Sequence, residues 1–321
     1  MWFNNIAKPK NPNCVVVLLK FRDSFHPYAI VTIVFWSLAY VLTRLSLHYF
    51  SSFSLGFLRY FVATCTLLIM ALITKMKLPQ KSDILYFFAA GAFGFFLYMI
   101  LFNMGCETVT AATSSIIIAT VPIITALLAR FINHEKLTVF QWVAILIEFS
   151  GVIILALMDH AFTLNHGLIW LFLAAIALSI YNLLQRKLTK TYSGLQASAY
   201  SIFAGTVMLS VFLPDSINEL QSAPSIQLVY LAILGVFSSA IAYASWAQAF
   251  KKAKKASSVS NYMFITPFLT SLLGFILAKE KLNVPTLVGG VVILFGMLIF
   301  NFGGKLYTRI IHKKVHSEES D

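Results

Sequence analysis

The stretch AATSSIIIATVPIITALLARFINHEKL at residues 111–137 recurs in altered form as ASSVSNYMFITPFLTSLLGFILAKEKL at residues 256–282. A constant offset of 145 residues aligns the shared positions, which are Ala111 with Ala256, Ser115 with Ser260, Pro122 with Pro267, and Glu-Lys-Leu at 135–137 with 280–282. Gly151 and Gly296 agree at the same offset in the apolar segments that follow. A proline followed thirteen residues later by Glu-Lys-Leu, twice, indicates an internal repeat.

The segments on either side of these stretches are apolar and long enough to cross a bilayer. The chain has 321 residues, of which 59% are hydrophobic and 11% charged, whereas a soluble domain has about 25% charged residues. A bilayer-spanning helix needs about 20 mostly apolar residues. We therefore expect an all-α integral membrane protein with no separate soluble catalytic domain, and with ten transmembrane helices over residues 27–47, 55–74, 84–103, 110–131, 139–158, 167–185, 195–213, 226–250, 256–278 and 285–302.

The basic residues are distributed unevenly between the loops. With the N-terminus inside, 20 of the 24 Lys and Arg residues fall on one side of the ten spans, and positive charge in short loops marks the cytoplasmic side. The loops around Glu107, Asp159 and residues 215–219 carry neither Lys nor Arg. The pattern predicts a cell (inner) membrane protein with a basic cytoplasmic leader at 1–26 and a cytoplasmic tail at 304–321. The net charge of +12 is split among six patches, which argues against nucleic-acid binding.

The repeat unit contains five spans, which is an odd number, so the second copy must be inverted relative to the first. We expect units at 27–158 and 166–303 that enclose a central cavity. Secondary transporters commonly use inverted repeats to build a site that opens alternately to each side of the membrane.

On these features the sequence resembles the drug/metabolite transporter superfamily, specifically its EamA-type branch with two repeats of five helices. The resemblance covers about residues 27–303, and its residues here are 36–40, Arg59, 122–135, 267–280, 151–155 and 289–296. It implies transport of small metabolites, since family members handle amino acids, nucleotide derivatives, sugars or drugs, and it implies that the fifth and tenth helices are peripheral. The counterpart of Arg59 lies near Ser201, so any role of this arginine is confined to one half.

Polar and aromatic side chains within the spans are the candidates for a substrate pathway, because polar groups are costly in hydrocarbon. Several fall on common helix faces by their spacing of three or four residues. The substrate-pathway candidates are Trp36, Tyr40, Thr43, Arg59, Tyr98, Asn103, Ser115, Asn182, Gln185, Ser239, Tyr243, Trp246, Ser260 and Asn261. Each of them could instead pack against a helix or lie at a membrane interface. The prediction of a substrate pathway therefore rests on the whole set of polar and aromatic helix faces more than on any single residue.

Charged residues inside the spans each have two interpretations. Arg59 could bind a substrate carboxylate or phosphate, or it could snorkel outward or pair with a helix end. Arg44 is expected to snorkel to the interface. Glu148 could couple transport to protons, although a bond to a neighbouring helix or an oligomer contact explains it more simply. Glu135 and Glu280 are expected to be structural parts of the repeat, with a gating salt bridge as the lesser alternative.

Pro122 and Pro267 predict helix kinks, because proline removes a backbone donor and frees a carbonyl. Such a kink could expose polar backbone to a substrate or could serve packing alone.

The function predicted from the sequence is secondary transport of a small metabolite, an amino acid or related compound, by alternating access and with export favoured. An uptake or exchange carrier, for example for a nucleotide derivative, and a non-transporting scaffold are the alternatives. The chain lacks H-E-x-x-H, G-x-S-x-G, paired intramembrane aspartates and a Walker loop, so no enzyme activity is expected. We expect no cofactor and no metal. The expected partners are a small-molecule substrate and the lipid bilayer, with protons left open, and the chain could act as a monomer or a homodimer.

Overall fold

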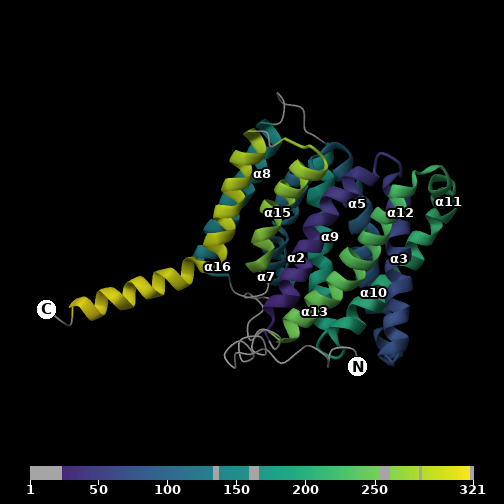
Figure 1. Cartoon of the computed structure of the whole chain (residues 1–321). Coiled ribbons are helices and arrows are strands. Elements are labelled where there is room, and N and C mark those ends of the chain that lie inside the picture. The colour runs from purple at the N-terminus through teal and green to yellow at the C-terminus, as the bar shows by residue number, and fades with distance from the viewer. Residues whose placement is uncertain (1–23, 133–136, 159–165, 253–260, 282–283, 319–321) are drawn as a thin grey trace, which may run out of the picture.

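The computed structural model describes residues 24–132, 137–158, 166–252, 261–281 and 284–318. All regular elements in these ranges are helices, and none is a strand (Figure 1). Within the same ranges, seven helical stretches are long and apolar enough to cross a membrane, and three shorter apolar helices accompany them. The all-α, multi-pass membrane fold predicted from the sequence is confirmed.

The first half of the chain folds into helices that follow the expected spans closely. Their bounds are α2 (His26–Ser46), α3 (Ser52–Ile73), η1 (Lys81–Asp83), α4 (Ile84–Gly91), η2 (Ala92–Leu97), α5 (Tyr98–Thr108), α6 (Ala111–Ile118), α7 (Val121–Ile132) and α8 (Val139–Met158). The third span thus runs from η1 through α5, and the fourth consists of α6 and α7.

The second half repeats this order with two differences from the expectation. Its helices are α9 (His166–Leu188), α10 (Gly194–Leu209), η3 (Ser210–Phe212), α11 (Leu213–Ser222), α12 (Ser225–Ala232), η4 (Ile233–Ile241), α13 (Ala242–Lys252), η5 (Asn261–Phe264), α15 (Ile265–Leu277) and α16 (Val284–Glu318). Residues 215–219 were expected in a loop but lie in α11, because Pro214 and Asp215 both favour a helix start. The helix of the tenth span continues beyond residue 304 and projects away from the bundle, since 305–318 contain neither Gly nor Pro (Figure 1).

Side-chain caps fix where several spans begin. The Ser51 hydroxyl accepts a hydrogen bond from Ser54 N at the start of α3, and Ser193 forms a capping box with Gln196 at the start of α10. Ser51 and Ser193 occupy matching places in the two halves, at the starts of the second and seventh spans. Such a cap contributes about 1 kcal/mol, so the register of these two spans is set by local sequence.

Irregular helix segments also recur at matching places in the two halves. The third span contains the π-helical segment η2 and the eighth contains the π-helical segment η4. In the fourth span, Ala119 and Thr120 separate α6 from α7 just ahead of Pro122. In the ninth span, the 3₁₀ segment η5 gives way to α15 just ahead of Pro267. A proline cannot continue the hydrogen-bond ladder of the preceding turn, which accounts for both interruptions.

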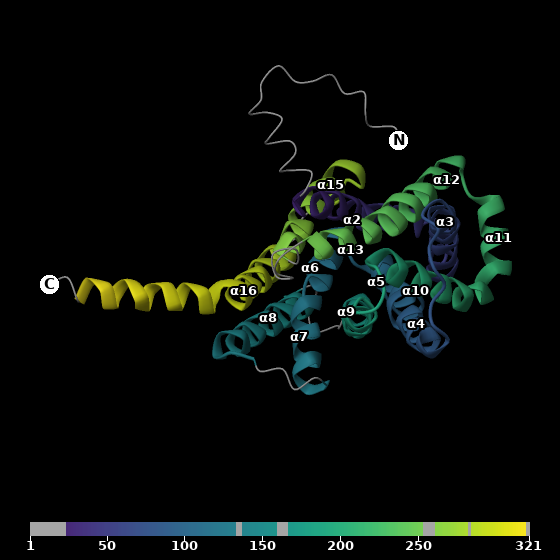
Figure 2. The same cartoon turned by 90° about the horizontal axis from the view of Figure 1, so that it is seen from below.

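The helices of the two halves pack in reciprocal pairs. The first span, α2, packs against α13 and α15, and the sixth span, α9, packs against α5 and α7. Likewise α3 packs against η4, and α10 packs against η2. Figures 1 and 2 show α8 and α16 side by side at one edge of the bundle. Each half therefore completes the other, and the middle of the bundle is lined by residues from both.

Two glycines 144 residues apart permit the close approach of these reciprocal pairs. A Cβ atom on Gly91 would lie 2.7 Å from the backbone nitrogen of Gly205 in α10. A Cβ atom on Gly235 would lie 2.5 Å from Cβ of Val62 in α3. Neither steric clash can be relieved by rotating a flexible side chain, so a side chain at either position would push the helices apart.

Gly91→Ala is expected to destabilise the protein by about 1–3 kcal/mol, because the added methyl group forces α4 away from α10. The measurement is the thermal unfolding midpoint in detergent. Gly304→Ala serves as the control, since a Cβ atom there lies 4.0 Å from the Phe140 side chain. An unchanged midpoint for Gly91→Ala would contradict the close contact between these helices.

Candidate functional site

Arg59 lies at the centre of a polar cluster inside the bundle. It is the eighth residue of α3, so it lies about 10 Å from the start of that helix at a rise of 1.5 Å per residue. Its side chain is 5% exposed. Arg59 Nε donates a hydrogen bond to Ser239 Oγ in η4 at 2.8 Å, and Nη1 contacts the Met99 sulfur at 4.0 Å. A snorkelling arginine would be exposed, so that alternative for Arg59 is wrong.

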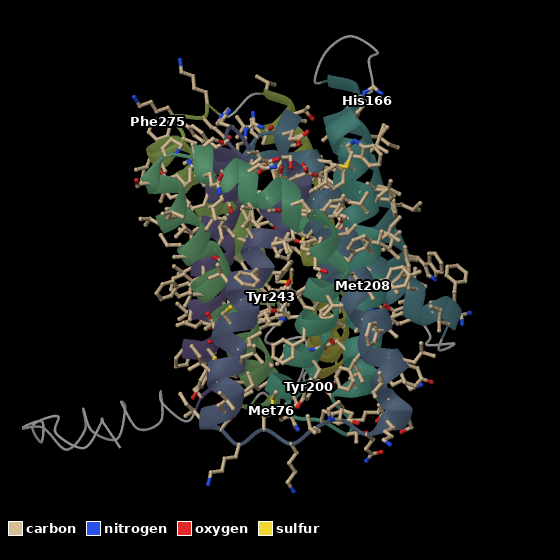
Figure 3. All side chains as sticks on the ribbon, turned by 90° about the vertical axis from the view of Figure 1, so that its right-hand side faces the viewer. Met76, His166, Tyr200, Met208, Tyr243 and Phe275 are labelled. Atoms are coloured by element: carbon tan, nitrogen blue, oxygen red, sulfur yellow. The ribbon has the colours of Figure 1, made fainter. Side chains whose placement is uncertain are left out.

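Aromatic side chains from several spans surround this arginine. The guanidinium carbon lies 5.8 Å from the ring centre of Tyr60, and Tyr40, Tyr98 and Tyr243 lie within electrostatic range of the same charge. Figure 3 places Tyr243 near mid-height of the bundle, with Met76 and Tyr200 toward one end and His166 and Phe275 toward the other. We define the central cluster as Trp36, Tyr40, Arg59, Tyr60, Tyr98, Ser239, Tyr243 and Trp246.

Direct ring contacts hold the aromatic members of the central cluster together. The ring centre of Trp36 lies 5.3 Å from that of Tyr243 and 5.2 Å from that of Trp246. Tyr40 meets Phe102 edge-on at 5.3 Å. Edge-to-face and tilted pairs at these separations are favourable because ring edges and faces carry opposite partial charge. The first, second, third and eighth spans thus meet at one aromatic centre.

The central cluster carries a positive charge that no carboxylate of the described residues balances. Arginine is permanently protonated in proteins, and Arg59 forms no ion pair with any described residue. The Tyr60 hydroxyl is also buried, and it faces the Tyr243 hydroxyl of the same cluster. Burying an unpaired charge is costly, so this arrangement is unusual for a purely structural core.

Other predicted pathway residues form hydrogen bonds between or within helices and are not members of the central cluster. Asn103 Nδ2 donates to Ser52 O at 2.8 Å, and the sixth-span residues Asn182 and Gln185 donate to Thr125 Oγ1 and Ser198 Oγ at 3.3 and 3.1 Å. Three more predicted residues are placed as follows: Ser115 donates to Ala112 O within α6, Thr43 is fully buried, and Asn261 begins η5. Ser260 and the Asn261 side chain lie outside the described part of the chain.

Sequence reasoning missed several residues at this centre. Tyr60 is fully buried, and Phe95 is fully buried with its ring 5.2 Å from that of Tyr60 and 5.0 Å from that of Tyr181. Tyr60 and Tyr181 directly adjoin the predicted residues Arg59 and Asn182. Both tyrosines lie well inside their spans, where the usual interfacial explanation of tyrosine does not apply. The position of the two tyrosines inside their spans was the sequence feature that could have identified them as candidates.

A second charged site lies where α2 ends. Arg44 Nε and Glu280 Oε1 form an ion pair at 3.0 Å, and Arg44 also donates to the backbone carbonyls of Cys106 and Glu107. Glu280 accepts a hydrogen bond from the backbone nitrogen of Ala111 at 3.0 Å, which places a carboxylate at the positive N-terminus of α6. The sequence did not predict this ion pair, which forms because reciprocal packing brings the segment that follows α15 within reach of Arg44.

This ion pair belongs to a wider set of contacts that we call the Arg44 network. The network comprises Arg44, Ser52, Glu107, Ala111 and Glu280. Its further contact is the hydrogen bond from Ser52 Oγ to Glu107 Oε1 at 2.6 Å. The network thereby ties together the first, second, third, fourth and ninth spans at one end of the bundle, and we call this end the Arg44 end.

Glu148 lies apart from the central cluster, on α8 where this helix packs against α16. It is 2% exposed, and neither carboxyl oxygen has a hydrogen-bond partner among the described residues. Its neighbours include Gly296, Thr120 and Phe172, and it borders a small cavity beside the break between α6 and α7. Its burial within one chain argues against the oligomer contact, and its lack of a partner argues against a bond to a neighbouring helix.

The described residues contain no group of three His, Cys, Asp or Glu side chains that could hold a metal ion.

Apolar spans packed around a charged, aromatic interior define a multi-pass membrane protein. The profile of the EamA-like transporter family matches residues 25–157 and again residues 165–302, and the chain belongs to this family. The family membership expected from the sequence is confirmed.

Curated relatives carry transporter names. The chain is 30% identical over 263 residues to "Uncharacterized transporter YdfC" of Bacillus subtilis, covering 82% of this chain and 86% of that protein. It is 29% identical over 274 residues to "Probable terminal-alkyne amino-acid exporter" of Streptantibioticus cattleyicolor, covering 85% and 91%. A solved crystal structure that is 17% identical shares the fold with a TM-score of 0.59, covering 86% of this chain and 94% of that chain.

A double-mutant cycle is expected to show coupling between Arg44 and Glu280. Glu280→Gln and Arg44→Gln each remove one partner, and the double variant should be less destabilised than the sum of the single variants by about 1 kcal/mol, as for contacting residues. The measurement is the unfolding free energy in detergent at low salt. Additive effects would show that the ion pair contributes nothing to stability.

Proposed function

We propose that this chain is a secondary transporter that moves an amino acid or related small metabolite across the cell membrane by alternating access, in the direction of export. The observation that carries the proposal is the buried central cluster, which is assembled from spans of both halves and holds an unbalanced charge. Family membership and the relative named as an amino-acid exporter support the same function. In this proposal the chain is not an enzyme and performs no covalent chemistry.

The proposed motion is a rocking of the units 27–158 and 166–303 around the central cluster. The Arg44 network joins helix ends that come from both units, so opening the bundle at the Arg44 end requires the Arg44–Glu280 ion pair to separate. Opening there also withdraws Glu280 from the N-terminus of α6. The network is therefore the proposed closure at that end.

The proposed orientation places the Arg44 end outside the cell and both chain termini in the cytoplasm. The support for it is the distribution of Lys and Arg, of which the sequence assigns 20 of 24 to the opposite side of the spans. Export then means that the substrate reaches the central cluster from the cytoplasm and leaves after the Arg44 network has opened.

Purified protein in liposomes is expected to move at least one compound of an amino-acid panel faster than protein-free liposomes do. The measurement is counterflow of labelled compound, which needs no assumed energy source. Failure to move any compound of a broad metabolite panel in either direction would contradict transport and favour a scaffold role.

We further propose Glu148 as the residue that couples transport to protons, because a buried carboxyl without a partner beside the α6–α7 break is the type of group that relays protons in membrane transporters. Glu148→Gln is expected to abolish uphill transport driven by a pH gradient while exchange continues, since exchange needs no net proton movement. Transport measured against external pH provides the readout. An unchanged pH dependence in this variant would remove Glu148 from the mechanism.

A further inference from the structure

The guanidinium of Arg59 has hydrogen-bond donors that the protein leaves unused. The group carries five N–H donors, and one of them, on Nε, is taken up by Ser239 Oγ. Nη1 contacts the Met99 thioether, which is a weak acceptor, and Nη2 has no acceptor among the described residues. Three N–H groups of this buried guanidinium therefore have no acceptor among the described residues, and a fourth has only the weak thioether.

We propose that Arg59 binds the carboxylate of the transported compound, and that this compound carries one carboxylate as its anionic group. The inference rests on the proposed transport function and names its substrate class. A carboxylate accepts two parallel N–H bonds from a guanidinium, and this charge-assisted pairing is roughly twice as strong as a neutral hydrogen bond. Binding would also supply the negative charge that the central cluster lacks.

The charge of the central cluster favours a carboxylate over a phosphate. Arg59 is its single charged member, and its other members are tyrosine, tryptophan and serine side chains. A phosphate monoester carries a charge of about −1.5 to −2 near neutral pH, so it would leave an uncompensated negative charge in a buried site. A carboxylate carries one negative charge and so matches the single charge of the guanidinium. Where the compound also carries an ammonium group, that positive charge needs a partner of its own.

The aromatic members of the cluster can hold the rest of an amino-acid substrate. Trp36, Tyr243 and Trp246 form a contiguous group of rings, and an ammonium group is attracted to the faces of such rings. No acidic side chain among the described residues contacts Arg59, so a substrate ammonium group near the guanidinium would find rings rather than a carboxylate. A zwitterion with its carboxylate on Arg59 and its ammonium group over the rings satisfies both features.

Ser239 is the positioning residue for this interaction. Its hydroxyl accepts the Nε hydrogen bond and so fixes the plane of the guanidinium, and it comes from the opposite half of the chain. The contact between α3 and η4 is therefore part of the binding geometry as well as of the packing.

The test is ligand-induced thermal stabilisation of the detergent-solubilised full chain, because a ligand that binds the folded state raises its stability by mass action. The probes are the twenty standard L-amino acids and a set of monocarboxylic acids, each paired with its methyl ester, together with O-phosphoserine and glycerol 3-phosphate. We expect at least one free acid to stabilise the protein and its ester to have no effect. Stabilisation by the phosphate compounds alone, by esters as well as acids, or by none of the probes would overturn the proposal.

Variants then assign the effect to Arg59. Arg59→Gln is expected to weaken binding of the stabilising acid about 10- to 100-fold, as for lost hydrogen bonds to a charged group, and to abolish the preference for acid over ester. Ser239→Ala should weaken binding less and keep that preference. Lys281→Gln, which removes an exposed cation, serves as the matched control and should behave as the parent protein.

A structural role for Arg59 predicts a different pattern. If Arg59 only held helices together, Arg59→Gln would lower the unfolding midpoint without ligand, whereas removal of an unbalanced buried charge should leave it unchanged or raise it. Arg59→Lys, which keeps the charge but loses the planar fork, should fold and bind more weakly than the parent. A folded Arg59→Gln variant that still discriminates acid from ester would overturn the proposal.

Counterflow in liposomes separates this proposal from the proposed function. If the parent transports the stabilising acid and Arg59→Gln keeps the same preference for acid over ester, the proposed role of Arg59 is contradicted. The proposed transport function then still stands. Binding of the acid through Arg59 without any movement across the membrane would contradict transport and leave the carboxylate site intact.

Discussion

Hydrocarbon offers no hydrogen bonds, and this constraint shapes every level of the structure. Each backbone group in the bilayer core must be satisfied within the protein, so the spans are helices. Irregular backbone is tolerated there where other parts of the protein surround it. The π-helical segments η2 and η4 follow this rule, because each packs against a helix of the opposite half. The reciprocal packing of the two halves is therefore what permits the helix interruptions near the middle of the bundle.

Packing features recur in the two halves, but the buried charge does not. Gly91 and Gly235 make equivalent close approaches in the two halves. At the position of Arg59, however, the second half has Ser201, whose hydroxyl donates to Ala197 O within its own helix. Among the described residues, the one buried cation thus comes from the first half and its partner Ser239 from the second. In our interpretation, repetition supplies two equivalent ways of tilting the halves, while the unique arginine supplies one substrate site.

The sequence predicts those features that depend on local pattern. Span positions, caps such as Ser193 with Gln196, and the repeat follow from residues close together in the chain or at one fixed offset. The pairing of Arg44 with Glu280 joins residues 236 positions apart and depends on how α2, α6 and α15 meet. From the neighbouring sequence alone, a solitary arginine near a span end is expected to snorkel to the interface, so this contact could not be predicted. Tyr60 was missed for a related reason, since the burial of its ring depends on packing against Phe95 of η2.

The two arginines of the first half differ in how their charge is balanced, and the difference matches their proposed roles. Arg44 has a carboxylate partner in a contact that keeps 26% and 14% of the two side chains exposed. Partly exposed ion pairs contribute little net stability, so such a contact can close one end of the bundle and still separate at modest cost. Arg59 is deeply buried and lacks a carboxylate, so the free energy of neutralising it is available to a ligand that brings one. In the proposed mechanism both arrangements help a transporter whose two states differ by only a few kcal/mol, because the closure is weak and the unbalanced charge of Arg59 is available to the substrate.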